Sequence, residues 1–222
     1  MKTKQLLIAL ATLAMAATTT LLTGCKSTGY DAGNKTAAGI QAAANQIAAM
    51  PAQIDTMLAS LNDIIEKPQA DLRPQYKQFA ANLSEVESSA KDIADARSAM
   101  ADKQKEFFAK WDEQLAQIKN EDIKARSQSR KEEVNQKMLA IKTSYLEAAT
   151  AFKPFMADLK DVQKYLSVDL TAAGVASIKE TAAKATQSAV PLKASIAKVA
   201  EDFKALGLAM SSVAPQPAAP AN

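Results

Sequence analysis

Apolar residues recur about every 3.5 residues through most of this chain, and this spacing limits the possible folds more than any other feature. Steps of three and four alternate within four segments, which is typical of supercoiled helices. The four apolar seams run from Ile40 to Ile65, Phe79 to Ile118, Val134 to Leu166 and Val175 to Leu206. Only six of 222 residues are glycine, and no stretch after residue 24 reads as a strand. We predict an all-α, elongated antiparallel helical bundle or coiled coil of about four helices.

Breaks in the pattern predict where these helices end. The first helix ends at Lys67-Pro68, and Pro74 suits the first position of the second. Asn120 is a candidate N-cap for the third helix. Residues 167–171 separate the third helix from the fourth, and Gly207 is expected to end the fourth.

The predicted helix lengths imply a protruding hairpin. The second and third helices have about 46 residues, or roughly 70 Å, whereas the first and fourth reach roughly 50 Å. The first helix would then cover the second only up to Lys105, and the fourth would cover the third only back to Lys131. We expect a two-helix hairpin around Asn120 to project past the bundle, at the end where both domain termini lie.

The first 25 residues have the order of a bacterial export signal. Lys2 and Lys4 precede an apolar run from Leu6 to Leu22, and the only cysteine, Cys25, follows. The run is shorter than the roughly 20 apolar residues of a spanning helix. An ordinary secretory signal would leave an unpaired thiol in an oxidising compartment. The segment resembles a bacterial lipoprotein signal, which implies cleavage after residue 24 and acylation of Cys25.

This resemblance divides the chain into four parts. They are a signal peptide at 1–24, a lipidated cysteine with a flexible tether at 25–35, the helical bundle at 36–207 and a disordered Pro/Ala tail at 208–222. The resemblance implies a place in the bacterial cell envelope, with the membrane reached through the lipid on Cys25. Lys26, where an aspartate would retain a lipoprotein at the inner membrane, favours the outer membrane, facing the periplasm.

Composition argues against most catalytic and metal chemistry. The chain has no histidine, so imidazole bases and histidine metal ligands are missing, and its one cysteine is assigned to lipid. Residues 1–24 hold two of the 27 basic residues and none of the 24 acidic ones, which leaves a mature chain with a net charge of +1. We expect no enzyme activity, no cofactor, no metal site and no nucleic-acid partner.

One aromatic group stands out in a chain poor in aromatics. Phe107 and Trp111 fall on the second seam, and Phe108 falls beside it. Core packing is the simpler interpretation, because aromatic residues at helical spacing are usually core. The alternative is a partner contact, since the first helix ends at this level and would leave the outer flanks of Phe108, Trp111 and Leu115 poorly covered.

Two polar features of the long helices have plain structural interpretations. Arg97 and Gln104 fall on the second seam, where polar residues commonly fix register or reach toward solvent. A buried polar pocket is the alternative. The charged segment 119–133 is expected to be a solvated tip with ion pairs between residues four apart.

A further pattern is formed by Phe108 and the run 111–115 before Asn120, then by the run Lys153-Pro154-Phe155 and the turn at 169–172. With these residues, most of the chain after residue 24 resembles an uncharacterised family of bacterial coiled-coil lipoproteins, domain of unknown function 2959. The family typically has a histidine-asparagine pair before its last helix, where this chain reads Ser-Val-Asp at 167–169. The resemblance implies an envelope location and a helical architecture, and it implies no activity.

These observations lead to two expectations for function. The first is a non-enzymatic envelope lipoprotein that serves as a structural or adaptor component through helical contacts with a protein partner. The alternative is a periplasmic binding module that holds a lipid or a hydrophobic peptide in an interhelical groove. Small residues at Ala182, Ala185 and Ala189 favour close helix approach and disfavour a groove there. The sequence leaves a homo-oligomer open.

Overall fold

The computed structural model describes residues 29–211, and every element in that range is a helix. The helices are α1 (Gly29–Glu66), α2 (Arg73–Gln117), α3 (Glu121–Val168), α4 (Ala172–Ser177) and α5 (Lys179–Met210). The predicted all-α fold is confirmed. None of the helices in this range combines the length and the hydropathy needed to cross a membrane.

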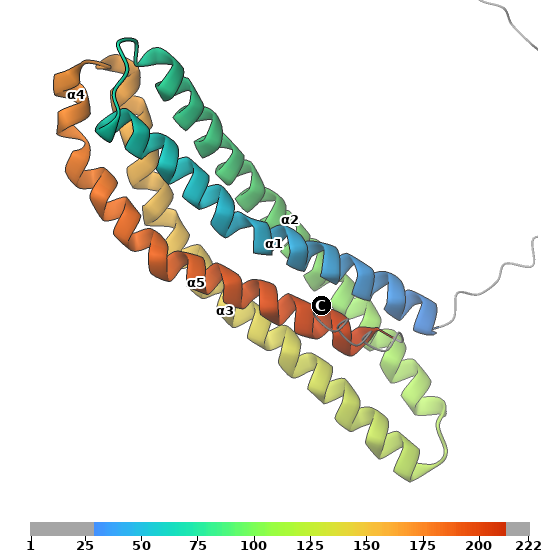
Figure 1. The fold of residues 1–222 in the computed structure, drawn as a ribbon. Helices are drawn as coiled ribbons and strands as arrows, with labels where there is room; N and C mark the ends of the chain where they lie inside the picture. Colours follow the sequence, from blue (N-terminus) through green and yellow to red (C-terminus); the bar gives the residue numbers. More distant parts are fainter. Residues whose placement is uncertain (1–28, 212–222) are drawn as a thin grey trace, which may run out of the picture.

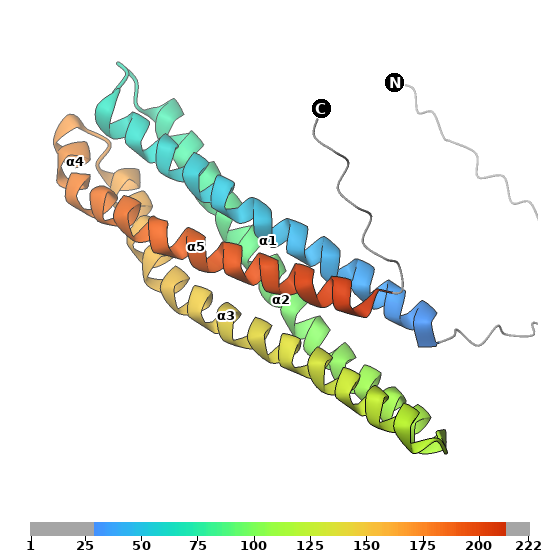
Figure 2. The ribbon, with the colours of Figure 1, turned by 60° about the horizontal axis from the view of Figure 1, so that its bottom comes forward.

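Four long helices lie side by side in antiparallel order, and the short α4 lies at the end opposite the α2–α3 turn (Figures 1 and 2). Helix α1 packs against α2 and α5, and α3 packs against the same two helices. Across the two diagonals, no pair of described residues approaches within 8 Å between Cα atoms. The topology is therefore the up-down-up-down bundle that the short connections predict.

The predicted seams form the core. Ile54, Phe79, Leu159 and Leu206, one from each long helix, have no exposed surface. Burial of such a side chain stabilises the fold by about 1.5–3 kcal/mol, so these rows hold the helices together. On α2 the coverage weakens beyond Ile93, because the seam residues Met100, Phe107 and Trp111 are only half-buried.

Side-chain caps define the helix ends at the two turns. The Gln75 side chain donates from Nε2 to the carbonyl oxygens of Asp63 (2.9 Å) and Lys67 (3.0 Å), which satisfies the C-terminal end of α1. Pro74 is the second residue of α2, one position after the predicted one and still in the first turn. Asn120 accepts from the backbone N–H of Ile123 through Oδ1 (3.1 Å), which confirms it as the N-cap of α3.

Both outer ends of the helical domain lie beyond their predicted positions. Helix α1 begins at Gly29 instead of residue 36, so residues 29–35 of the predicted tether are helical. Helix α5 continues to Met210, past the predicted end at 207. Tertiary contact explains both differences, because a Cβ on Gly33 would lie 3.6 Å from the Met210 carbonyl oxygen. The two helix ends support each other, which local composition does not reveal.

Gly207 lies inside α5 and does not cap it. It is buried, and a Cβ added there would lie 3.4 Å from the Ala37 carbonyl oxygen and 3.5 Å from Ile40 Cγ2. The residue is small because the backbones of α1 and α5 come close at this level. The prediction that Gly207 ends the helix was therefore wrong.

The predicted fourth helix is divided in two at Ile178. The hydroxyl of Thr171 caps α4 by accepting from the Gly174 backbone N–H (3.2 Å), and it donates to Asp169 Oδ1 (2.6 Å). That donation, with the Thr171 backbone N–H at 3.3 Å, holds the pKa of Asp169 below its ordinary value. Asp169 thus serves the local turn.

Candidate functional site

The hairpin of α2 and α3 projects beyond the ends of α1 and α5, as predicted (Figures 1 and 2). The α1–α2 register is fixed by hydrogen bonds from Gln53 to Glu85 (3.3 Å) and from Asn82 to the Thr56 carbonyl (3.5 Å). Extending this register along two straight helices places Gly29 level with about residue 109 of α2. Helix α1 therefore covers about one turn more of α2 than the predicted limit at Lys105, and the overhang is shorter than expected.

The end of α5 marks the limit on the other side. Arg130 donates from Nη2 to the carbonyl oxygen of Ala209, in the last turn of α5, and pairs with Glu133 through Nη1. This side-chain bond holds the pKa of Glu133 below its ordinary value. The free part of the hairpin thus comprises about residues 110–129.

The aromatic group lies where the hairpin leaves the bundle. Phe107, Phe108 and Trp111 are all half-buried and contact one another, with ring centroids 5.4–6.5 Å apart. Phe107 and Trp111 meet nearly edge to face, at 84°. Such pairs stabilise by about 0.5–1.5 kcal/mol beyond the area they bury. The group therefore packs the hairpin and also keeps part of its surface open.

Trp111 also fastens the two arms of the hairpin through a polar contact. Its indole Nε1 donates to Ser127 Oγ at 2.9 Å, across the α2–α3 interface. Sequence reasoning did not assign Ser127 this role. Its position in the sequence could have indicated the contact, because Trp111 and Ser127 are separated from the turn at Asn120 by similar numbers of residues.

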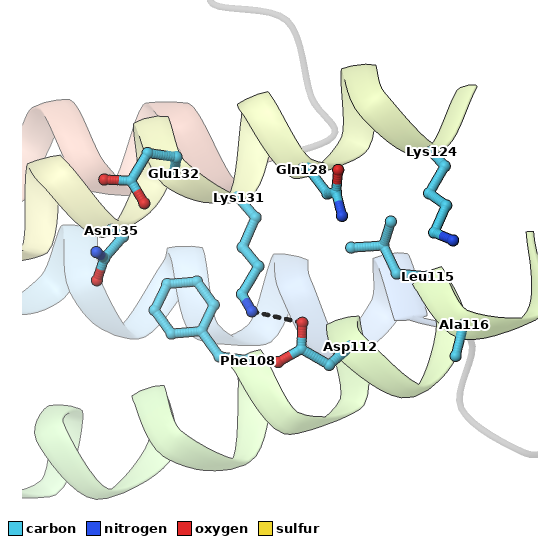
Figure 3. Close-up of a pocket in the computed structure, with 9 residues that line it drawn as sticks. All are labelled: Phe108, Asp112, Leu115, Ala116, Lys124, Gln128, Lys131, Glu132 and Asn135. Carbon is cyan, nitrogen blue, oxygen red and sulfur yellow. Dashed lines mark hydrogen bonds and ion pairs between the residues drawn. The ribbon is translucent and has the colours of Figure 1, made fainter. Parts of the chain in front are cut away.

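Leu115 differs from its prediction. It is 5% exposed, whereas the sequence suggested a poorly covered outer flank. The turn at Asn120 brings α3 back across α2, so Lys124 and Gln128 lie beside Leu115 (Figure 3). The exposed apolar residue at the tip is instead Ile123, at 55%.

A hollow of about 600 Å³ opens on one side of the hairpin (Figure 3). Phe108, Asp112, Leu115 and Ala116 line it from α2, and Lys124, Gln128, Lys131, Glu132 and Asn135 line it from α3. Lys131 pairs with Asp112 (2.5 Å) and lies 5.5 Å from the centre of the Phe108 ring. The hollow therefore presents lysine, carboxylate and amide side chains around the Phe108 ring.

The charged segment 119–133 is not only a solvated tip. Lys131 links α3 to α2, and Arg130 links α3 to α5, so two of its five basic residues make contacts between helices. The ion pairs within the segment join residues three apart, Lys124 with Glu121 and Arg130 with Glu133, and not four apart as expected. Within residues 29–211, no group of three or more Asp, Glu, His or Cys side chains is placed to hold a metal ion.

Arg97 faces an aromatic ring. Its guanidinium carbon lies 5.2 Å from the centre of the Tyr145 ring on α3, and the side chain is half-buried. A cation over a ring stabilises by about 0.5–1 kcal/mol at such a partly exposed site. The predicted role in register fits this contact, because it joins α2 to α3 at one level.

The middle of the bundle has a small apolar hollow that is partly open to the outside. It measures about 80 Å³ and is lined by residues of all four long helices, among them Met50, Ile93, Ala148 and Ile196. Ala182, Ala185 and Ala189 are buried at 1–2% exposure, so α5 packs closely along its small residues, as predicted. Ligand pockets usually measure about 300–1,000 Å³.

Cys25, the signal at 1–24 and the first part of the tether lie outside the described residues, as do residues 212–222 of the tail. The predicted lipidation site therefore stays a prediction.

Comparison with known proteins assigns a family. No curated protein and no solved structure matches the chain. One family model, described as "Protein of unknown function (DUF2959)", matches residues 24–205, which is most of the chain. The chain therefore belongs to the DUF2959 family.

Proposed function

We propose that this protein is a lipid-anchored component of the bacterial cell envelope that works as a structural element or adaptor. In this proposal Cys25 carries the lipid, and the bundle stands in the periplasm on the outer membrane. The protein catalyses no reaction and binds a protein partner through its helical surface. Family membership agrees with this proposal but does not carry it, because the family has no assigned activity.

The observation that carries the proposal is the α2–α3 hairpin, which extends past the rest of the bundle (Figure 1). The aromatic rings at its base are partly exposed. Clustered aromatic side chains on a surface favour protein contact. Ile123, exposed at the tip, adds an apolar side chain to the surface of the hairpin. These features are typical of a projecting contact surface on a rigid support.

The alternative, a module that holds a lipid or a hydrophobic peptide between its helices, has less support. The central cavity of about 80 Å³ is several times smaller than a usual ligand pocket. The larger hollow of about 600 Å³ beside the hairpin is open to its outside. We therefore favour contact at the surface over enclosure of a ligand.

Replacing Cys25 with Ala is expected to abolish acylation, because the thiol is the acyl acceptor. Metabolic labelling with a radioactive fatty acid measures this directly. The Lys26→Asp variant is the matched control: it keeps the acceptor, and we expect it to stay labelled while moving to the inner-membrane fraction. Label retained by Cys25→Ala would contradict the proposed anchor.

A photo-cross-linking amino acid placed at Ile123 is expected to capture a protein in intact cells. The matched control is the same amino acid at Val190, which is 65% exposed on α5, away from the hairpin. Both positions are exposed and apolar, so they differ mainly in place. A discrete adduct from position 123 and none from position 190, detected by blotting, is the expected result. Equal adducts, or none from either position, would contradict an adaptor that works through the hairpin.

A further inference from the structure

The interface between α2 and α3 is open between the bundle centre and the aromatic group. A groove of about 350 Å³ runs along this stretch, between residues 97–108 of α2 and 138–142 of α3. This volume falls within the usual range for binding sites. Met100, Phe108, Met138 and Ile141 give the groove an apolar floor.

Three cations border this floor. Arg97 and Lys105 stand on the α2 side, and Lys142 stands on the α3 side. No carboxylate lines the groove: the α2 acids of this stretch, Asp102 and Glu106, are not among its lining residues. Within residues 29–211, neither lysine makes an ion pair, and Arg97 contacts a ring and no carboxylate. The groove is therefore an apolar surface bordered by positive charge that the described part of the chain leaves uncompensated.

We propose that this groove binds an amphipathic helix of a partner protein, with apolar residues toward Met138 and Phe108 and carboxylates on both flanks toward Arg97, Lys105 and Lys142. The inference rests on the proposed adaptor function and names the chemistry of the partner. A helix laid in a groove between two helices repeats the packing of the bundle itself. Complementary charge on the flanks would fix its register and orientation.

The spacing of the cations favours a helix over a lipid headgroup. Arg97 and Lys105 are eight residues apart on one helix, which is about 12 Å along its axis. A single phosphate cannot pair with both at once, whereas carboxylates two turns apart on a docked helix match this separation. Lys142 lies on the opposite side of the groove, so the partner needs acids on both of its flanks.

The test measures binding of two dye-labelled synthetic peptides to the full chain in phosphatidylcholine nanodiscs, by fluorescence anisotropy. One peptide of about 18 residues carries a leucine seam flanked by glutamates, and its counterpart carries lysines in place of the glutamates. We expect the glutamate peptide to bind and the lysine peptide not to bind. The double variant Lys105→Glu/Lys142→Glu should weaken binding by about tenfold or more.

Lys153→Glu is the matched control, because Lys153 is exposed on α3 outside the groove, and it should leave binding unchanged. Lys105 and Lys142 are also exposed, so equal helical circular dichroism checks that the double variant keeps the fold. Undiminished binding to the double variant, or no binding of the glutamate peptide, would overturn the inference. Binding of phosphatidylglycerol vesicles that the double variant loses, without peptide binding, would assign the groove to a headgroup and overturn it too.

The two proposals fail separately. Peptide binding tests the groove alone, whereas cross-linking at position 123 tests whether the hairpin meets a protein in the cell. An adduct from position 123 with no peptide binding would support the adaptor function and contradict only the proposal that the groove binds an acidic helix.

Discussion

Leu159→Ala is expected to lower the free energy of unfolding by about 2–5 kcal/mol. Leu159 has no exposed surface and lies on the α3 seam, in the core cluster to which all four long helices contribute. Truncation removes its apolar contacts and leaves a cavity, which the rigid packing of long helices can close only in part. Chemical denaturation followed by circular dichroism measures the change.

The matched control is Leu146→Ala, the same substitution on the same helix at a side chain that is 51% exposed. We expect that change to stay within about 0.5 kcal/mol. Lys131 would be a poor control despite its place in the charged segment, because it pairs with Asp112 and lies over Phe108. Similar losses for Leu159→Ala and Leu146→Ala would contradict the seam described for α3.

Gly174→Ala is expected to destabilise the protein by about 1–3 kcal/mol. A Cβ at this position would lie 2.3 Å from the carbonyl oxygen of Asp169 and 2.7 Å from its Cγ. A backbone oxygen cannot move aside as a flexible side chain can, so the turn at 169–171 must shift. That shift would also disturb the cap that Thr171 provides to α4.

Gly39→Ala should act in the opposite direction. Gly39 lies inside α1, and a Cβ there meets nothing within 4 Å. Alanine in place of glycine inside a helix should therefore stabilise by about 0.5–1 kcal/mol. Thermal denaturation of both variants compares the signs, and destabilisation by Gly39→Ala or no loss with Gly174→Ala would contradict the packing described here.

The sequence predicted the seams well, because burial in a helical bundle follows the spacing of apolar residues, and this spacing can be measured directly along the sequence. The N-cap Asn120 was equally predictable, since its side chain satisfies a backbone N–H of its own helix. So was Pro74 in the first turn of α2, because proline has no N–H to leave unsatisfied there. The start of α1 was not, because Gly29–Lys35 becomes helical through contact with the distant end of α5. Gly207 was misread for the same reason: its small size serves a neighbouring helix and not its own end.

The candidate site shows the same division. The position of the aromatic group, at the base of a protruding hairpin, followed from helix lengths. The coverage of Leu115 and the bond from Trp111 to Ser127 did not, because both depend on how α3 lies across α2 after the turn. The uncompensated cations of the groove were also missed, since Lys105 and Lys142 are far apart in sequence and share a surface only in the bundle.

If the proposed lipid anchor holds, the early start of α1 limits how the bundle can be oriented on a bilayer. With the lipid on Cys25, as proposed, only four residue steps separate the anchor from Gly29, a linker of at most about 14 Å. The hairpin overhangs the start of α1 at the same end by about eight residues, or about 12 Å. The linker and the overhang are thus nearly equal in length, so a bundle that stands perpendicular to the membrane brings the hairpin tip into contact with the lipid headgroups. If the linker is less extended, the bundle must tilt, and the contact at the hairpin tip determines the direction of the tilt.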